Sequence, residues 1–189
     1  MDISFKDLIK LWGKPCNQKE IDLDLPVGHI STDSRTLEKG DFFVPLVGNT
    51  YDGHDYLDMA YNIGIQAAIV SEQFNGLVPT DLSYWVVPDT LYAYQQIALL
   101  HRRKLKLPVV AVTGSVGKTT TRELIRAILS PLGEIVSSRG NENNDVGVPK
   151  TLLRGSETDA AFVLEMGMRG FGQIERLSRV AEPDIAVIT

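Results

Sequence analysis

The sequence has almost no cysteine and no long hydrophobic run. Cys16 is the single cysteine among 189 residues, which excludes an internal disulfide. No stretch approaches the roughly 18 consecutive apolar residues of a membrane-spanning helix, so no membrane insertion is expected. The first residues, MDISFKDLIKLWG, lack the basic and then apolar order of a signal peptide. Together these absences favour a cytoplasmic protein.

The chain also lacks an excess of positive charge. Its 19 basic and 24 acidic side chains give a net charge of −5, which argues against nucleic acid as the main partner. A hydrophobic content of 43% and a charged content of 23% are those of an ordinary globular protein. The length is sufficient for one large or two small domains.

The most informative stretch is VVAVTGSVGKTTT, residues 109–121. A β-branched run predicts a buried strand, and an amphipathic segment after the glycines predicts a helix that ends at Pro131. Strand, glycine-rich turn, Lys-Thr and helix form the layout of a cradle for nucleotide phosphates. Lys118 is then expected to reach the β- and γ-phosphates, and the Thr119 hydroxyl to bind Mg²⁺.

This match to the pattern GxxxxGK[ST] is incomplete, because Val112 stands where the first glycine would be. An ordinary strand–turn–helix corner is therefore an alternative. A lysine followed by hydroxyl side chains at a helix start favours nucleotide binding.

Hydrophobic periodicity divides the chain into two halves of different texture. In the first half it predicts short strands at 30–32, 41–46, 66–70 and 84–87, with Pro45 indicating an edge strand. Helices are expected at the N-terminus, from the Ser4 cap to Gly13, and around Tyr56–Ile63 up to Gly64. A helix over 89–106 connects the halves.

The second half has the alternating pattern of a parallel α/β domain. Strands are predicted at 109–113, 134–138, 160–166 and 184–188, and helices at 118–130, 147–154 and 172–180. The sequence stops at Thr189 at the end of a strand, so this second domain is expected to be incomplete.

Two polar segments follow strands on the rim that carries Lys118. Glu165 ends the strand 160–166, where a Mg²⁺-binding carboxylate is expected, although a strand-end acid pointing to water is the alternative. The run RGNENND, residues 139–145, follows the strand 134–138, and asparagines that form local turns are an alternative to a site there.

Two turns in the first half are also candidates. Asp33-Ser34-Arg35 and GNTYDG (48–53) could hold a ribose or phosphate, and equally could be ordinary turns. His54 is expected at most to cap the following helix.

The order of five segments resembles the Mur ligases, which form amide bonds with ATP during peptidoglycan precursor synthesis. The segments are STDSRTLEKGDFFVPLVGNTYDGH, VVAVTGSVGKTTT, NENNDVGVPKTLL, VLEMGMRGFGQIERL and PDIAVIT. The shortened glycine loop of this family has the form TGxxGKT, which accounts for Val112. The third and fourth segments most resemble the members that add D-alanyl-D-alanine.

The resemblance implies a small N-terminal α/β domain (1–85) that binds the UDP-linked substrate, a connecting helix (86–106) and the first part of a P-loop-type ATPase domain (107–189). ATP and Mg²⁺ are the implied cofactors. It implies that the glycine loop (Gly114, Ser115, Val116, Gly117, Lys118, Thr119, Thr120) and Asn143 and Asn144 bind ATP. Lys118 and Glu165 are implied as catalytic, and Thr119 and Glu165 as metal ligands. Thr32, Ser34, Asn49, Thr50 and Tyr51 would contact the UDP-sugar.

The implied reaction joins D-alanyl-D-alanine to UDP-N-acetylmuramoyl-tripeptide through an acyl phosphate. The intact enzyme is expected to be a monomer, and residues 1–189 alone are expected to be inactive. Alternatives are another amino-acid ligase of the family, a ligase like folylpolyglutamate synthase, and a nucleotide-binding fragment without catalysis.

Overall fold

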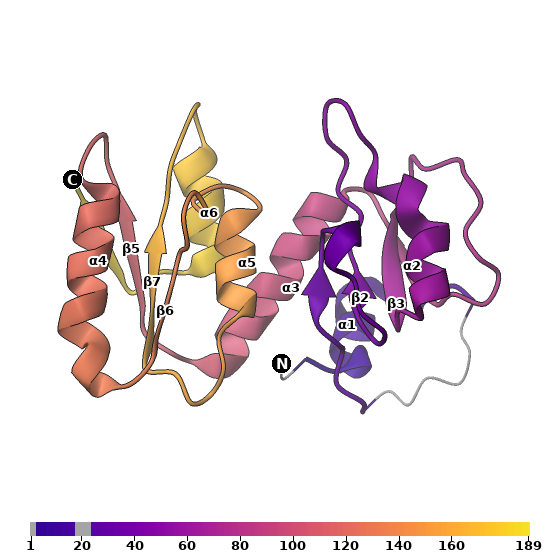
Figure 1. Cartoon of the computed structure of the whole chain (residues 1–189), viewed down its shortest axis with the longest axis horizontal. Coiled ribbons are helices and arrows are strands. Elements are labelled where there is room, and N and C mark those ends of the chain that lie inside the picture. Colours follow the sequence, from indigo (N-terminus) through magenta and orange to yellow (C-terminus); the bar gives the residue numbers. More distant parts are fainter. Residues whose placement is uncertain (1–2, 18–23) are drawn as a thin grey trace. The chain divides into compact units, whose positions relative to one another are not determined.

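The computed structural model describes residues 3–17 and 24–189. They form two compact units, Met1–Tyr94 and Gln95–Thr189, whose boundary falls inside helix α3 (Thr90–Leu105) (Figure 1). No helix in the described part of the chain has both the length and the apolar composition needed to cross a membrane.

The first unit is built on a four-stranded parallel sheet in the order β1-β2-β3-β4. The strands are β1 (Ile30–Ser31), β2 (Phe42–Phe43), β3 (Ala67–Ser71) and β4 (Tyr84–Val87). The helices are α1 (Phe5–Trp12) and α2 (Leu57–Ile63), with 3₁₀ turns at Ser34–Thr36 and Gly53–Tyr56.

Successive side chains of β2 serve the two sides of this sheet, as strand geometry requires. Phe42 packs near the indole of Trp85, which also meets Phe5 and Trp12 of α1. Phe43 belongs to the opposite cluster with Leu57 and other apolar residues of the α2 side. The sheet is therefore covered on both faces.

The helix boundaries predicted for this unit are confirmed. The N–H and hydroxyl of Ser4 donate to the Asp7 carboxylate at 3.1 and 2.9 Å, which fixes the start of α1. Gly13 and Gly64 end α1 and α2 with φ of +80° and +91°, a conformation that costs glycine little.

Two expectations for this unit are wrong. β2 lies between β1 and β3 rather than at an edge; Pro45 is tolerated because the strand ends at Phe43 and no ladder hydrogen bond is lost. His54 is buried instead of simply capping a helix. The Asp52 carboxylate caps the turn by accepting from the His54 N–H at 2.9 Å.

The second unit is a second parallel sheet with strand order β6-β7-β5-β8. The strands are β5 (Val109–Thr113), β6 (Ile135–Ser137), β7 (Ala161–Glu165) and β8 (Ile185–Ile188). The helices are α4 (Lys118–Leu129), α5 (Gly147–Leu153) and α6 (Gln173–Ala181), with a 3₁₀ turn at Ser130–Leu132. Each agrees closely with the ranges predicted from periodicity.

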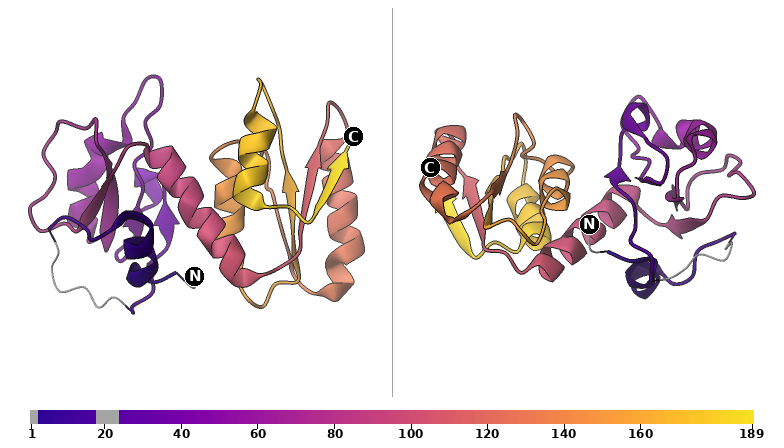
Figure 2. Two further views of the ribbon diagram at one scale, coloured as in Figure 1. Left: turned by 180° about the vertical axis from the view of Figure 1, so that it is seen from behind. Right: turned by 60° about the horizontal axis from the view of Figure 1, so that its bottom comes forward.

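Helices cover both faces of this sheet, with α4 on one side and α5 and α6 on the other (Figure 2). Alternate residues of β7 point to alternate sides: Phe162 and Leu164 join the α5–α6 core, while Ala161 and Val163 pack with Ile125 and Leu129 of α4. Glu165 continues the second set, so its side chain is directed towards α4.

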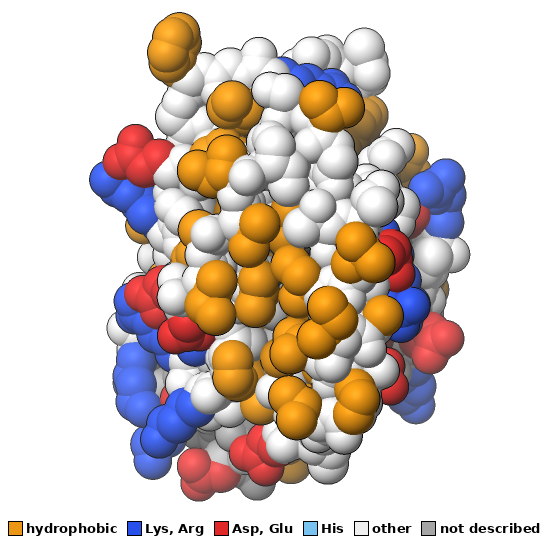
Figure 3. Space-filling model, turned by 90° about the vertical axis from the view of Figure 1, so that its left-hand side faces the viewer, with side chains coloured by type: hydrophobic (Ala, Val, Ile, Leu, Met, Phe, Trp, Pro, Cys, Tyr) orange, Lys and Arg blue, Asp and Glu red, His pale blue; other side chains and the backbone are white. Residues whose placement is uncertain are grey.

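The α4 side of this unit leaves several large apolar side chains exposed, as Figure 3 shows. On α4 and in the turns at its two ends these are Val116, Leu124, Ile128 and Leu132, and the edge strand β8 adds the exposed Ile185 and Ile188. The apolar stripe predicted on α4 is thus split: Ile125 and Leu129 contact the sheet, while Leu124 and Ile128 remain exposed. β8 is an edge strand of the sheet.

The contacts of the buried His54 side chain predict that the stability of the first unit depends on pH. Its Nδ1 lies 2.5 Å from Asp52 Oδ1, and its Nε2 accepts from the Ser71 N–H at 2.9 Å. Burial raises the pKa of Asp52, but hydrogen bonds from the His54 backbone and ring outweigh that effect, so the pKa is lowered. The carboxylate therefore stabilises the fold above about pH 4, and this contribution is lost as the pH falls through the lowered pKa.

We expect Asp52→Asn to lower the free energy of unfolding at neutral pH by about 0.5–1 kcal/mol, after screening by solvent at this half-exposed position. The further loss of stability below pH 4 should be smaller than in the wild type. Urea unfolding followed by tryptophan fluorescence reports on this unit, because Trp12 and Trp85 are the only tryptophans. The exposed Glu72→Gln serves as the control, and equal pH profiles for all three proteins would contradict the prediction.

Candidate functional site

The loop between β5 and α4 is shaped by two glycines with positive φ, Gly114 at +139° and Gly117 at +83°. A side chain at Gly114 would place its Cβ 2.0 Å from the Thr189 carbonyl oxygen, so only glycine fits there. The Lys118 ammonium donates to the Gly114 carbonyl at 2.8 Å and closes the loop on itself. This is the strand–loop–helix geometry expected of a phosphate cradle.

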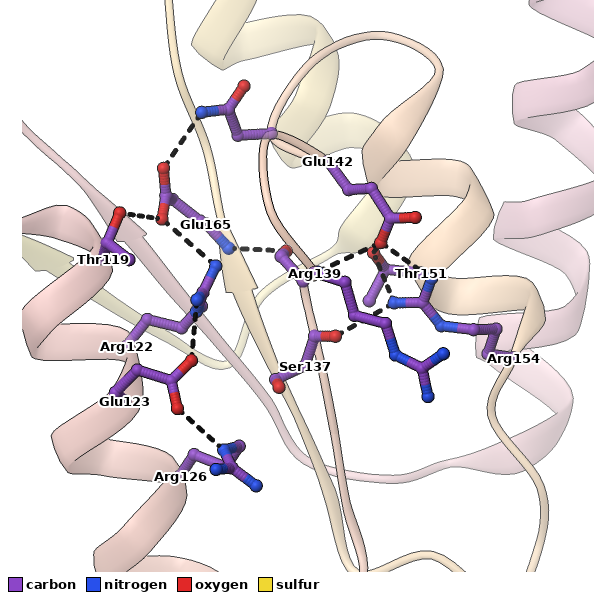
Figure 4. Close-up of polar contacts among 12 residues, drawn as sticks. Thr119, Arg122, Glu123, Arg126, Ser137, Arg139, Glu142, Thr151, Arg154 and Glu165 are labelled. Atoms are coloured by element: carbon purple, nitrogen blue, oxygen red, sulfur yellow. Dashed lines mark hydrogen bonds and ion pairs between the residues drawn. The ribbon is translucent and has the colours of Figure 1, made fainter.

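Glu165 lies beside the strand that leads into this loop. It is the register partner of Val112, and the following Met166 N–H donates to the Val112 carbonyl at 2.8 Å. Its Oε2 accepts from the Thr119 hydroxyl at 2.8 Å, and its Oε1 accepts from the Asn143 amide at 2.9 Å (Figure 4). The carboxylate thus links the helix after β5 with the loop after β6.

The surroundings of Glu165 are those of a structured carboxylate rather than a strand-end acid in water. The residue is only 4% exposed. Arg122 Nη1 lies 3.3 Å from the same Oε2, and the Glu165 N–H donates to the Ser138 hydroxyl at 3.0 Å. A buried carboxylate is stable only when such donors compensate for the loss of water.

A hard cation fits the oxygen atoms of this corner. The Thr119 hydroxyl and the Glu165 carboxylate are adjacent, and both are ligand types that Mg²⁺ accepts. Among the residues that the structure describes, no three His, Cys, Asp or Glu side chains group to hold a metal. A cation here would therefore need further oxygen ligands, as Mg²⁺ obtains from phosphates and water in phosphoryl-transfer sites.

The polar loop after β6 is held in place by its own side chains. Asn144 Oδ1 accepts from the N–H groups of Val146 and Gly147 at 3.1 and 2.8 Å and so begins α5. The Asn143 carbonyl accepts from the Gly167 N–H at 2.8 Å. The asparagines therefore form local turns and can also serve the site. The bonds of Asn144 shape the loop, and the bond from Gly167 to Asn143 holds it beside the end of β7.

Glu142 braces this loop from inside. It accepts from Arg154 Nη1 at 2.7 Å and from the Arg139 N–H at 3.1 Å (Figure 4). Burial raises the pKa of Glu142, but the hydrogen bonds from Arg154 and Arg139 and the charges of Arg154 and Lys150 outweigh it, and the pKa is lowered. The loop therefore depends on an ionised carboxylate.

These segments enclose a cavity of about 690 Å³ at the carboxyl ends of the strands. Its volume suits a nucleotide-sized ligand. It is lined by Gly114, Ser115, Lys118, Asn141, Asn143, Asn144, Asp145, Val146, Gly167, Met168, Arg169 and Gln173. The structure thus brings five predicted residues to one cavity: Gly114, Ser115, Lys118, Asn143 and Asn144. Val116, Gly117, Thr119, Thr120 and Glu165 are not among its lining residues, although Thr119 and Glu165 bond each other beside it.

Family comparisons agree with this geometry. Residues 26–114 match the model described as "Mur ligase family, catalytic domain", and residues 112–189 match "Mur ligase middle domain". Together the two matches extend from residue 26 to residue 189. The chain belongs to the Mur ligase family.

Individual Mur ligases show how the chain compares with relatives. It is 45% identical over 166 residues to the UDP-N-acetylmuramoyl-tripeptide–D-alanyl-D-alanine ligase of Synechocystis sp., a match that covers 88% of this chain and 36% of that ligase. A crystal structure of MurF from Acinetobacter baumannii superposes with a TM-score of 0.88 at 33% identity, over 98% of this chain and 40% of the other.

A crystal structure of the Thermotoga maritima MurF ligase in complex with ADP gives a TM-score of 0.77 at 30% identity, over 86% of this chain and 37% of the other. The chain thus spans little more than a third of the length of the Mur ligases it matches.

The candidate UDP-sugar residues of this Mur ligase follow two neighbouring strands of the first unit. Thr32 and Ser34 come after β1, and Ser34 begins the 3₁₀ turn Ser34–Thr36. Asn49, Thr50 and Tyr51 lie in the turn after β2 that the Val47–Asp52 bridge closes. Arg35 is engaged by Asp33, with Nε and Nη2 at 2.9 and 2.7 Å from its carboxylate oxygens. The assignment of these five residues to the UDP-sugar stays a prediction.

Sequence reasoning missed Arg122, Ser138 and Glu142. The available signal was helical spacing, since Arg122 is three residues after Thr119 and in phase with the sheet-facing Ile125 and Leu129. Ser138 and Glu142 gave no comparable signal, because their partners come from segments separated in sequence.

Glu142→Gln is expected to destabilise the second unit by about 1–2 kcal/mol, because a charge-assisted hydrogen bond to Arg154 becomes a neutral one. The lowered pKa means that this stabilisation is complete above the ordinary carboxyl pKa and disappears as the pH falls through the lowered value. Urea unfolding followed by circular dichroism, at neutral pH and near pH 3, measures both effects. Glu157→Gln, which changes an exposed carboxylate in the same unit, is the control. An equal loss of stability in that variant would show that Glu142 has no specific stabilising role.

Proposed function

We propose that this chain is the nucleotide-binding and UDP-sugar-binding part of a ligase that adds D-alanyl-D-alanine to UDP-N-acetylmuramoyl-tripeptide with ATP and Mg²⁺. The observation that supports this best is the convergence of the glycine loop, Glu165 and Asn143 beside one cavity. The similarity to ligases named for this reaction supports the choice of substrates.

In the proposed reaction, a carboxylate oxygen of the tripeptide attacks the γ-phosphorus of ATP. The bond to the β-phosphate oxygen breaks, and ADP leaves with that electron pair. The amine of D-alanyl-D-alanine then attacks the acyl carbon, loses a proton and displaces inorganic phosphate. The protein has to neutralise charge on the transferred phosphoryl group and align the reactants.

The residues of the second unit suit these tasks. The Lys118 ammonium is a charged donor on the cavity wall, and the N-terminus of the 12-residue helix α4 adds partial positive charge. Thr119 and Glu165 would hold Mg²⁺, which supplies charge neutralisation at the phosphates when bound. Asn143 and Asn144 would line the nucleotide site.

For the first unit we propose contact of the UDP-sugar with Thr32, Ser34 and the Asn49–Tyr51 turn. The carboxyl ends of parallel strands are the usual place for ligands in such sheets, and both turns follow strands at that end. Hydroxyl and amide groups there suit ribose and phosphate oxygens.

Replacement of Lys118 by alanine should weaken ATP binding by the 189-residue chain about 10–150-fold, since one charge-assisted contact is lost. Calorimetric titration with ATP and Mg²⁺ measures the change. Arg179→Ala, which removes an exposed cation from α6, should leave the affinity unaltered. Equal affinities for wild type and Lys118→Ala would remove Lys118 from the site.

The proposed reaction itself is testable in a chimaera. The chain replaces the matching segment of the Synechocystis ligase, and product is assayed by mass spectrometry with UDP-N-acetylmuramoyl-tripeptide, D-alanyl-D-alanine and ATP. We expect ATP-dependent product, and a loss in the Lys118→Ala chimaera that exceeds the loss of affinity because charge develops in the transition state. A folded chimaera that binds ATP without making product would favour the alternative of a nucleotide-binding fragment.

Binding of UDP-N-acetylmuramoyl-tripeptide to the 189-residue chain should change NMR chemical shifts at Thr32, Ser34 and Asn49–Tyr51. Ser34→Ala should weaken this binding by roughly 2–10-fold, as loss of a neutral hydrogen bond does, whereas Ser156→Ala in the other unit should not. Shift changes confined to other residues at saturation would disprove the assignment. Preference for a UDP-linked dipeptide would favour another amino-acid ligase of the family.

A further inference from the structure

Arg122 is a buried cation on the face of α4 that meets the sheet. It is 5% exposed, and its Nε has no hydrogen-bond partner among the residues the structure describes. Burying a guanidinium with one donor unsatisfied costs free energy, and an apolar side chain in phase with Ile125 and Leu129 would avoid that cost. Packing alone therefore gives no reason for arginine at this position.

The Arg122 guanidinium lies between two carboxylates that differ in exposure. Nη2 lies 2.7 Å from Glu123 Oε1, and Nη1 lies 3.3 Å from Glu165 Oε2. Glu123 is half exposed and also accepts from Arg126 at 3.0 Å, whereas Glu165 is buried. Arg122 is thus held firmly by Glu123 and places its positive charge against Glu165 (Figure 4).

Arg122 and Thr119 occupy the same oxygen of Glu165. This Oε2 lies next to the hydroxyl that would be the second protein ligand of a cation, while Oε1 is engaged by Asn143. The corner holds one carboxylate, and that carboxylate is already paired with a guanidinium. A divalent cation arriving alone finds little net negative charge there, whereas one bound to a nucleotide brings phosphate oxygens as additional anionic ligands.

We propose that Arg122 is a positioning residue that neutralises Glu165 in the nucleotide-free protein and so makes cation binding at Glu165 conditional on the nucleotide. This inference rests on the proposed role of Thr119 and Glu165 as cation ligands. The guanidinium keeps the carboxylate oriented towards Thr119 and suppresses binding of free divalent cations.

The test measures Mn²⁺ affinity of the 189-residue chain without nucleotide, by the paramagnetic resonance signal of free Mn²⁺. Arg122→Met keeps a long apolar stem and removes the charge. We expect it to bind Mn²⁺ at least about tenfold more tightly than the wild type, since a positive charge near the cation has been removed. A purely structural arginine would give lower stability and no gain in affinity.

Three variants locate the effect. Arg122→Lys retains a cation and should bind Mn²⁺ as weakly as the wild type. Arg126→Met removes the neighbouring, more exposed arginine, which pairs with Glu123 Oε2, and should also match the wild type. The double variant Arg122→Met with Glu165→Gln should lose the gain, which places the extra Mn²⁺ at Glu165 rather than at Glu123.

Circular dichroism identifies which variants are folded. If Arg122→Met is unfolded, the comparison moves to Arg122→Gln, which is also neutral and can still hydrogen-bond to Glu123. No gain in Mn²⁺ affinity in a folded neutral variant would overturn the inference. Mn²⁺-dependent ATP binding by Glu165→Gln tests the proposed function separately: a normal dependence would remove Glu165 as a cation ligand, whatever the arginine variants show.

Discussion

The second unit depends on the burial of one carboxylate. Glu165 sits where a β-strand ends, on the side of the sheet that faces α4, with almost no access to water. A charge in that position needs donors, and these come from two segments: Thr119 and Arg122 on α4 and Asn143 on the loop after β6. The backbone N–H of Glu165 donates to the Ser138 hydroxyl of the same loop. The requirement to compensate one charge therefore fixes the glycine-loop helix and the polar loop relative to the same strand.

Two loops at the carboxyl ends of the strands of the second unit owe their shapes to different causes. The chain leaves β5 for β6, two positions away, and returns to the other side of β5 only with β8. Such a reversal leaves a crevice at the carboxyl ends of the strands on either side of it. The loop at 113–118 gains its shape from glycine dihedrals, whereas the loop at 139–146 gains it from side-chain bonds to Asn144 and Glu142. The first loop is thus shaped by backbone conformation, and the second by side-chain hydrogen bonds, of which only those to Glu142 involve a charge.

Most of the fold was predictable because its signals are local. Alternating or continuous apolar residues marked every strand of the second unit, and caps such as Ser4 and Gly64 marked helix ends. Glu165 was predictable from its place at a strand end. Arg122 had only its helical spacing as a signal, and a lone arginine in a helix usually lies at the surface. Its burial depends on which face of α4 meets β7, which the sequence does not fix. The expectations for Pro45 and His54 were wrong for the same reason. The strands that flank β2 and the packing of the His54 ring depend on tertiary contacts, which local sequence does not show.

All the paired strands of both described sheets run parallel, so no strand can pair with its neighbour through a tight turn. Each pair of strands can form only after the segment between them has closed a loop. For β5 the two partners, β7 and β8, come more than 45 residues later in the sequence. Folding of the second unit should consequently be slow for its size, on a timescale set by loop closure. During that interval the β5 strand, which is almost entirely apolar, stays without partners, and a newly made chain is most vulnerable to aggregation through it.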